Sequence, residues 1–141
     1  MVIIRVALNV PVDCLFDYIA SEATQQDVGL RVRVPFGKKL LTGIIMGVST
    51  DTLVSPEKLK AAKCILRDIP PLPAQLLDLF RFCSEYYHHP LGMVVLNGLP
   101  ARLRDCKPIK SNKSQEDVVY RLTVSGKQVD TSTIPSRNTV Q

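Results

Sequence analysis

The sequence predicts an α+β fold, and two observations carry this expectation. Over about the first 68 residues, short segments rich in β-branched residues alternate with turn signals, and one long segment contains two glycines. Short strands of this kind are typical of a small closed or partly closed barrel, here of the OB-like kind. From residue 73 onwards the apolar residues recur at helical spacing instead. A short helical subdomain is therefore expected after the barrel.

Five strands are expected in the barrel half. Residues 2–8 are mostly β-branched and stop at Asn9 and Pro11, and proline ends a strand because it cannot donate to the ladder. Residues 31–35 alternate charged and apolar side chains at period two, which predicts a half-buried strand with Arg31 and Arg33 on one face. The other expected strands cover residues 14–20, 40–49 and 60–66.

Turn residues connect these strands. Residues 36–39 are expected to form a hairpin turn with Gly37 at positive φ. Gly43 and Gly47 lie inside the long strand, where glycine marks a bulge or a barrel bend. Residues 55–58 begin with Ser-Pro and predict one helical turn, with serine as the cap and proline at the first position.

The second half is expected to be helical. A helix over about 73–87 follows a proline-rich run, since Leu76, Phe80, Cys83 and Tyr87 repeat at helical spacing. The run His88-His89-Pro90 ends it, because proline cannot continue a helix. A shorter helix is expected at 91–96, a basic, proline-punctuated linker from 102 to 113, and one more strand at 118–123.

The charge distribution favours an anionic partner for the barrel half. The chain has 141 residues and a formal net charge of +5. Residues 28–63 carry seven basic side chains against two acidic ones, and such an excess is the electrostatic footprint of nucleic-acid binding or simply a solvated face. No apolar run approaches the roughly 18 residues that a membrane span needs, and the N-terminus does not resemble a signal peptide. We expect a cytoplasmic protein.

No motif for catalysis or for a metal site is found. The sequence lacks a phosphate-binding loop, a dinucleotide fingerprint, a zinc-protease motif and a nucleophile elbow. The cysteines at 14, 64, 83 and 106 form no C-x₂-C pair, so no zinc site is expected. Cys14, Cys64 and Cys83 lie in apolar runs and are expected to be buried. The adjacent His88 and His89 suit a helix end better than a shared metal.

Several short motifs in the same order carry a resemblance to a known family. The chain resembles the N-terminal domain of bacterial primosomal protein N′, the PriA replication-restart helicases, over about residues 2–105. The motifs occupy residues 6–11, 15–18, 29–38, 42–45, 59–60, 85–92 and 99–100. The resemblance implies a DNA 3′-end-binding domain at 1–105, with a barrel at about 1–68 and helices at about 73–98. It also implies a linker at 106–117 and a partial winged-helix domain, or a disordered tail, at 118–141.

The resemblance implies a pocket for the 3′-terminal nucleotide of a nascent leading strand, built by Phe16, Asp17, Gly37 and Lys60. Each residue type suits that task. An aromatic ring stacks on any base, which is worth about 1–3 kcal/mol, and glycine permits close backbone approach. A carboxylate repels phosphate but accepts hydrogen bonds from base amino or imino groups or from a free 3′-hydroxyl. Lysine supplies a mobile cation for a phosphate or a base acceptor. The alternative reading makes them a core ring, a turn acid, a turn glycine and a solvated lysine. The expected phosphate-contacting surround comprises Arg31, Arg33, Lys38, Lys39 and Lys63.

The working surface is thus expected around residues 16–18 and 34–38. The expected ligand is forked or single-stranded DNA with a free 3′ end, bound by a recognition module without enzymatic activity of its own. ATP and zinc are expected only in the longer helicases that the chain resembles, as are contacts to other primosome proteins and to single-strand-binding protein. The alternative function is a protein-interaction barrel that docks those partner proteins.

Overall fold

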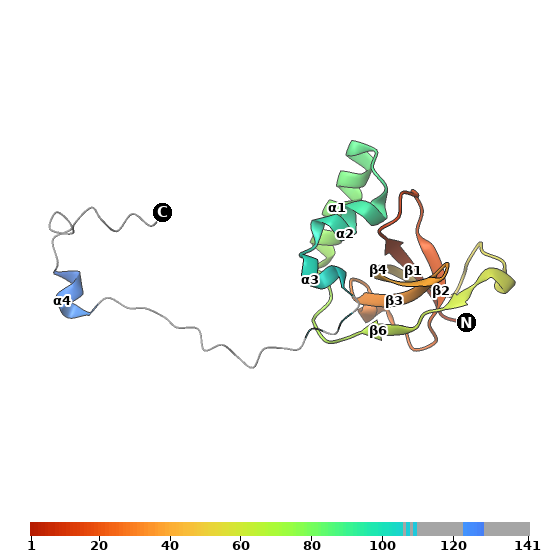
Figure 1. Cartoon of the computed structure of the whole chain (residues 1–141), viewed down its shortest axis with the longest axis horizontal. Coiled ribbons are helices and arrows are strands. Elements are labelled where there is room, and N and C mark those ends of the chain that lie inside the picture. The colour runs from red at the N-terminus through yellow and green to blue at the C-terminus, as the bar shows by residue number, and fades with distance from the viewer. Residues whose placement is uncertain (106, 108, 110–122, 129–141) are drawn as a thin grey trace. The chain divides into compact units, whose positions relative to one another are not determined.

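A computed structural model of the chain describes residues 1–105, 107, 109 and 123–128. The chain divides into two units, Met1–Lys110 and Ser111–Gln141. In the first unit a six-stranded sheet curls around an apolar interior, and helices follow it in sequence (Figure 1). The first unit therefore has the α+β class that the sequence predicts. Within the described part of the chain, no helix is long and apolar enough to cross a membrane.

The sheet order places early and late strands side by side. The strands are β1 (Ile3–Leu8), β2 (Phe16–Ile19), β3 (Arg31–Phe36), β4 (Lys39–Ser49), β5 (Lys60–Ala61) and β6 (Cys64–Leu66). They are ordered β5-β2-β1-β4-β3-β6, and every neighbouring pair is antiparallel except β2 and β5, which are parallel. The strands expected at 2–8, 31–35 and 40–49 are confirmed, and the one expected at 14–20 is shorter.

The segment at 60–66 differs from its prediction as a single strand. It forms two short strands, because its pairing partner changes halfway: β5 pairs with β2, and β6 pairs with β3. Between them, the Ala62 N–H donates to the Ile19 carbonyl (2.9 Å) and the Lys63 N–H donates to the Arg33 carbonyl (2.8 Å). The segment therefore forms the strands at both edges of the curled sheet, which gives a partly closed barrel consistent with an OB-like fold.

Two apolar clusters lie on the two faces of the sheet. One fills the interior with alternate residues of each strand, for example Val6 of β1 and Ile45 of β4. The other contains Ala7 and Ile44, which face outwards and pack against α1 (Ala74–Tyr87) and α2 (Leu91–Gly98). The helices expected at 73–87 and 91–96 are thus confirmed, and they cover one outer face of the barrel (Figure 1).

The approach of α2 to β1 depends on one glycine. Gly92 is buried, and a Cβ built there would collide with the backbone of Leu8, including its carbonyl oxygen. Any larger residue would push α2 away from the end of β1. The glycine in the family-like motif at 85–92 is therefore explained by packing.

The long strand β4 bends as its glycines suggest. Along β1, the partner on β4 changes from Gly47 opposite Arg5 to Ile45 opposite Val6, which leaves Met46 as an extra residue in a bulge. At the other end, Gly37 has a φ of 59° in the turn that joins β3 to β4. The predicted hairpin with Gly37 at positive φ is confirmed.

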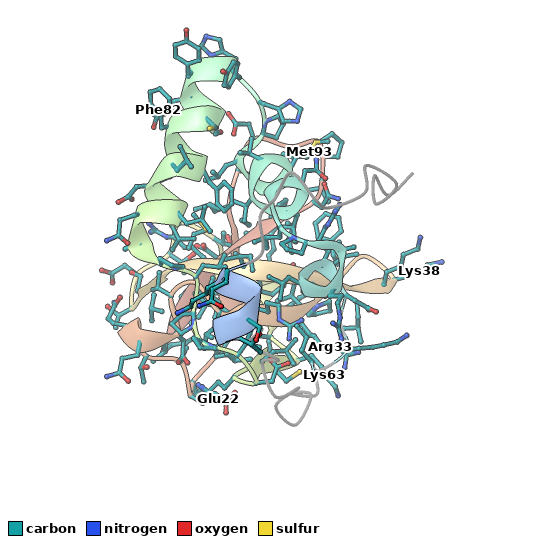
Figure 2. The ribbon with its side chains drawn as sticks, turned by 90° about the vertical axis from the view of Figure 1, so that its left-hand side faces the viewer. Glu22, Arg33, Lys38, Lys63, Phe82 and Met93 are labelled. Carbon is teal, nitrogen blue, oxygen red and sulfur yellow. The ribbon has the colours of Figure 1, made fainter. Side chains whose placement is uncertain are left out.

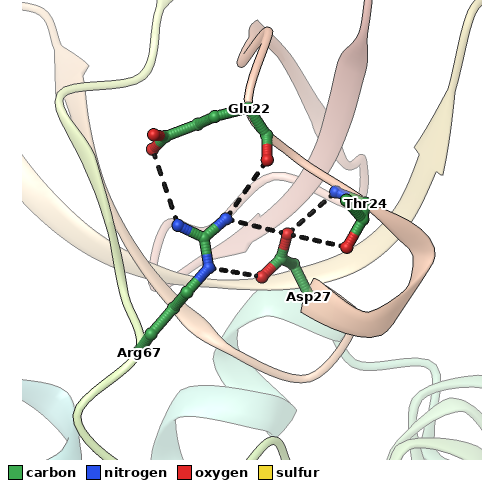
Figure 3. A network of polar contacts seen from close by, with 4 residues as sticks. All are labelled: Glu22, Thr24, Asp27 and Arg67. Atoms are coloured by element: carbon green, nitrogen blue, oxygen red, sulfur yellow. Dashed lines mark hydrogen bonds and ion pairs between the residues drawn. The ribbon is translucent and has the colours of Figure 1, made fainter.

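A polar network ties the chain after β6 to the turn before β3 (Figure 3). The Arg67 guanidinium donates from Nε to Asp27 Oδ1 (2.8 Å) and from Nη2 to Asp27 Oδ2 (3.0 Å), and Nη2 also contacts the Glu22 carbonyl (3.2 Å). The Thr24 N–H donates to the same carboxylate (2.8 Å). Asp27 ends the 3₁₀ turn η1 (Gln25–Asp27). The hydrogen bond from Arg67 holds the pKa of Asp27 below its usual range, although burial opposes this shift.

Two short turns complete the described elements of the first unit. The helical turn expected at 55–58 is present as η2 (Pro56–Lys58), although the Ser55 side chain makes no capping bond. The linker expected from 102 begins instead with a helical turn, α3 (Ala101–Arg104).

In the second unit the structure describes the short helix α4 (Val124–Lys127). The strand expected at 118–123 lies outside the described residues apart from Thr123. The expected winged-helix fragment therefore stays a prediction.

Candidate nucleic-acid interface

A hollow of about 370 Å³ opens beside β2, and all four residues expected to form the terminal-nucleotide pocket line it. Phe16 and Asp17 come from β2, Gly37 from the hairpin between β3 and β4, and Lys60 from β5. Val54 and Lys58, from the loop between β4 and β5, complete one wall. Elements that are far apart in sequence thus bring an aromatic ring, a carboxylate, a glycine turn and two ammonium groups to one cavity.

The Phe16 ring is fixed by a second aromatic ring. Phe16 and Phe36 meet edge to face, with centroids 5.2 Å apart and planes at 83°, a favoured geometry for aromatic pairs. Phe16 is half-buried and also packs against the interior cluster. It therefore has both expected characters, since it supports the core and lines the hollow.

Asp17 is the acidic member of the hollow, and its side chain is only 11% exposed. The Thr52 hydroxyl donates to Asp17 Oδ2 at 2.6 Å, a short hydrogen bond. Arg5, its cross-strand neighbour on β1, has Nε 3.9 Å from Oδ1, too far for a hydrogen bond. Oδ1 therefore has a long ion-pair contact with Arg5 and keeps its capacity to accept a hydrogen bond.

Gly37 and Tyr18 shape the turn side of the hollow. A Cβ built on Gly37 would meet no atom within 4 Å, so the space beside this residue is open. The Tyr18 hydroxyl donates to the Pro35 carbonyl at 3.2 Å and links β2 to β3. Burial raises the pKa of Tyr18, which keeps the phenol neutral. Lys60 is exposed and lies opposite Tyr18 in the parallel pair of β5 and β2.

Four of the five cations expected around the hollow reach the surface. Lys38, Lys39 and Lys63 are exposed and Arg33 is half-buried; in Figure 2, Lys38, Arg33 and Lys63 project towards the same side of the view. Arg33 and Lys63 are linked through the backbone bond between β3 and the closing segment.

Arg31 does not fit its expected role as a phosphate contact. Its side chain is 2% exposed, and Nη2 donates to both oxygens of Asp68 at 2.8 and 2.6 Å. Burial opposes ionisation of Asp68, but the hydrogen bond from Arg31 keeps its pKa below the usual range. The Ile109 N–H donates to the same carboxylate at 2.5 Å. The pair therefore holds the chain that follows α3. The prediction that Arg31 contacts phosphate is wrong, because the alternation along β3 does not place both arginines at the surface.

Other residues differ from expectation or escaped it. Cys14 is exposed and lines the hollow, whereas the apolar run around it predicted burial. The sequence did not predict that Lys58 or Thr52 belongs to the site. Lys58 contributed to the count of basic residues, and a threonine in a loop is too common to indicate a function. His88 ends α1 as its C-cap, with a φ of 50°, as the helix-end interpretation expects. Among the described residues, no group of three or more His, Cys, Asp or Glu side chains is placed to hold a metal ion.

A larger hollow, of about 610 Å³, lies beside the C-terminal half of α1. Its lining mixes acidic and basic groups, including Asp13, Glu85 and Arg81, and among the described residues that line it His88 alone has an aromatic ring. Carboxylates without neighbouring lysines disfavour a polyanion. The smaller hollow at β2 is therefore the better candidate for nucleic acid.

Comparisons with known proteins show the family to which the chain belongs. The family described as the 3′DNA-binding domain (3′BD) of PriA matches residues 5–100. The chain is 35% identical over 128 residues to the replication restart protein PriA of Haemophilus influenzae, which covers 90% of the chain and 17% of that relative. It is also 35% identical over 105 residues to replication restart protein PriA of Rickettsia conorii, covering 71% of the chain and 15% of the relative. The chain thus spans about a sixth of these relatives.

Proposed function

Because the chain belongs to the family of PriA 3′DNA-binding domains, we propose that it binds the 3′ end of a DNA strand in the hollow beside β2. The observation that carries this proposal is the position of Asp17. A carboxylate in a hollow rimmed by lysines is unfavourable for internal phosphates, but it suits a terminal sugar whose 3′-hydroxyl donates a hydrogen bond.

Each lining residue has a distinct task in this proposal. The terminal base stacks against Phe16, which tolerates any base because every base has a π-face. Asp17 accepts from the 3′-hydroxyl, and the open space at Gly37 admits the nucleotide close to the backbone. Lys60 and Lys58, which line the same hollow, neutralise the phosphate on the 5′ side of the terminal nucleotide.

The outer cations add affinity without reading the end. Arg33, Lys38, Lys39 and Lys63 contact phosphates of the preceding nucleotides or of a duplex arm. Arg31 has no part in this contact, since its guanidinium is buried against Asp68.

The decisive experiment compares two chemical ends of one oligonucleotide. Fluorescence anisotropy at fixed salt should show a DNA with a 3′-hydroxyl binding at least about tenfold more tightly than the same DNA with a 3′-phosphate, because a phosphate both removes the donor and brings like charge to Asp17. Asp17→Asn should reduce this ratio more than it reduces overall affinity. Lys39→Ala, the matched surface change, should weaken both DNAs equally and flatten the salt dependence. Equal affinities of the wild-type chain for the two ends would refute the pocket.

The biological setting follows from the relatives. We propose that the chain recognises the 3′ end of the nascent leading strand at a stalled or branched fork, as the recognition module of a replication-restart helicase that assembles the primosome. The helicase reaction, with its ATP and zinc sites, would then belong to the remaining five-sixths of a protein of the relatives' length. Other primosome proteins and single-strand-binding protein would be partners of that longer protein.

A second candidate function, the docking of such partner proteins, is favoured by the outer face of α1. Phe82, Tyr86 and Tyr87 are 58%, 65% and 70% exposed. Phe82 and Tyr86 stack with centroids 5.6 Å apart, and Figure 2 shows Phe82 on the side of α1 that faces away from α2. An NMR titration of the labelled chain with a 3′-hydroxyl dinucleotide separates the two functions. Shifts at Phe16 and Gly37 support end binding, and shifts confined to α1 contradict it.

A further inference from the structure

The loop between β4 and β5 is attached to the acid of the hollow by a single side chain. Thr52 donates its hydroxyl to Asp17 Oδ2 (2.6 Å) and at the same time accepts the Val54 N–H through the same oxygen (3.0 Å). The hydroxyl therefore has a defined direction: its hydrogen points to the carboxylate and a lone pair to the loop backbone. No other residue is placed between the loop and Asp17 in this way among the described hydrogen bonds.

The hydroxyl also fixes which carboxylate oxygen is available. The terminal torsion of an aspartate side chain is broad, so an unrestrained carboxylate rotates between many orientations. Oδ2 is held by Thr52, and Oδ1 has only a long ion-pair contact with Arg5 Nε at 3.9 Å, so Oδ1 keeps its hydrogen-bond acceptor capacity. A ligand hydroxyl then meets an acceptor that is already oriented, which lowers the entropic cost of the bond.

The same bond positions a wall of the hollow. Val54 and Lys58 line the hollow from this loop, and Leu59, at the loop's end, is buried. The loop is thus held near its start by Thr52 and at its end by the burial of Leu59. Without the hydroxyl, Val54 would lose its link to β2, whereas Lys58 would still be held by Leu59 and by the pairing of β5 with β2.

From this arrangement we propose that Thr52 is a positioning residue for end recognition, an inference that rests on the proposed function. Its hydroxyl orients the Asp17 carboxylate for the 3′-hydroxyl of the terminal nucleotide and holds Val54 in the wall of the hollow. Thr52 does not itself touch the DNA. Its effect is on the discrimination between ends, not on the general attraction of the cationic surface for phosphate.

The test uses the ratio of two dissociation constants, for the 3′-phosphate and the 3′-hydroxyl form of one oligonucleotide. Thr52→Val keeps the shape but removes the hydroxyl. It should lower this ratio by about three- to tenfold, the effect of losing one ordinary hydrogen bond's worth of orientation at Asp17. Thr52→Ser keeps the hydroxyl and should retain the wild-type ratio. Ser55→Ala, which removes a hydroxyl from the same loop where none caps the turn, should leave the ratio unchanged.

The outcomes separate this proposal from the one it rests on. If the wild-type chain discriminates between the ends and Thr52→Val discriminates equally well, Thr52 is not a positioning residue and the end-binding function stands. If Thr52→Val binds the 3′-hydroxyl end more tightly than wild type, the threonine competes with the ligand for Asp17, which also overturns the proposal. If the wild-type chain does not discriminate, the proposed function itself fails. Thermal melting of each variant identifies any loss of folded protein.

Discussion

Gly37 serves both the backbone turn and the space for the ligand, and the structure predicts that alanine and asparagine variants rank differently in stability and in DNA affinity. Gly37 has a φ of 59°, and a Cβ there would meet no atom within 4 Å. An alanine is therefore strained only by its backbone conformation, which costs about 1–2 kcal/mol. The alanine also restricts the unfolded chain, which offsets about 0.4–1 kcal/mol. Gly37→Ala should thus lower the free energy of unfolding by about 1 kcal/mol.

Asparagine adopts the left-handed conformation more readily than alanine, yet its side chain is larger. The expected order of stability in urea denaturation is therefore wild type, then Gly37→Asn, then Gly37→Ala. The order of affinity for a 3′-hydroxyl oligonucleotide should differ, because a side chain at this position projects into the space that the nucleotide would enter. Losing part of a stacking contact worth about 1–3 kcal/mol weakens binding several-fold for alanine and more for asparagine.

A second glycine of the same sheet provides the control. Gly47 on β4 also has no atom within 4 Å of a built Cβ, and its φ is not in the positive region. Gly47→Ala should change neither stability nor affinity appreciably. If the affinities of the Gly37 variants follow their stabilities, with asparagine binding as well as glycine, then Gly37 serves only the turn and the proposed approach of the nucleotide is wrong.

Two further predictions concern charges that the fold uses. Arg31→Met should lower the free energy of unfolding by about 3 kcal/mol, because removing one partner of a buried pair leaves the Asp68 carboxylate uncompensated. The folded fraction of this variant should bind DNA with unchanged salt dependence. A reduced salt slope would show instead that Arg31 contacts phosphate. Because the pKa of Asp27 is lowered, its ionised form should stabilise the fold above about pH 4, the ordinary pKa range of an aspartate, and this stability should be lost as the pH falls through the lowered pKa. Arg67→Met should reduce the pH dependence of the free energy of unfolding, measured by urea titrations from pH 7 to pH 3. An unchanged pH dependence would contradict the role of the network.

The fold was predictable where a periodic pattern and a turn signal agreed. Residues 31–35, with the turn at Gly37 after them, gave both a strand and its hairpin, and the helical spacing after residue 73 gave α1. The segment at 60–66 was harder, because a period of two predicts a strand but does not say which neighbour it pairs with. Its division into two strands is decided by tertiary pairing on both sides.

The candidate site was predictable through family motifs and less so through physical pattern. Composition gave a basic surface with an aromatic nearby, and the motifs singled out the four residues that line one hollow in the structure. The same alternation that found β3 gave the wrong environment for Arg31. A period of two fixes only the face of a sheet on which a side chain lies, and the segment carrying Asp68 covers that face. Thr52 could not be found, since its importance depends on a contact 35 residues distant.

The segment that closes the barrel also forms part of the hollow. Lys60 reaches the hollow because β5 pairs with β2, and β5 is held there by a segment whose other end, β6, pairs with β3. Leu59 is buried immediately before this pairing and anchors the loop that carries Lys58. The cations that line the hollow with Asp17, Lys58 and Lys60, therefore belong to the segment that closes the sheet and the loop before it. It follows that a change weakening this closure, even one remote from Asp17, should reduce end discrimination before it unfolds β1 and β4, which lie at the centre of the sheet.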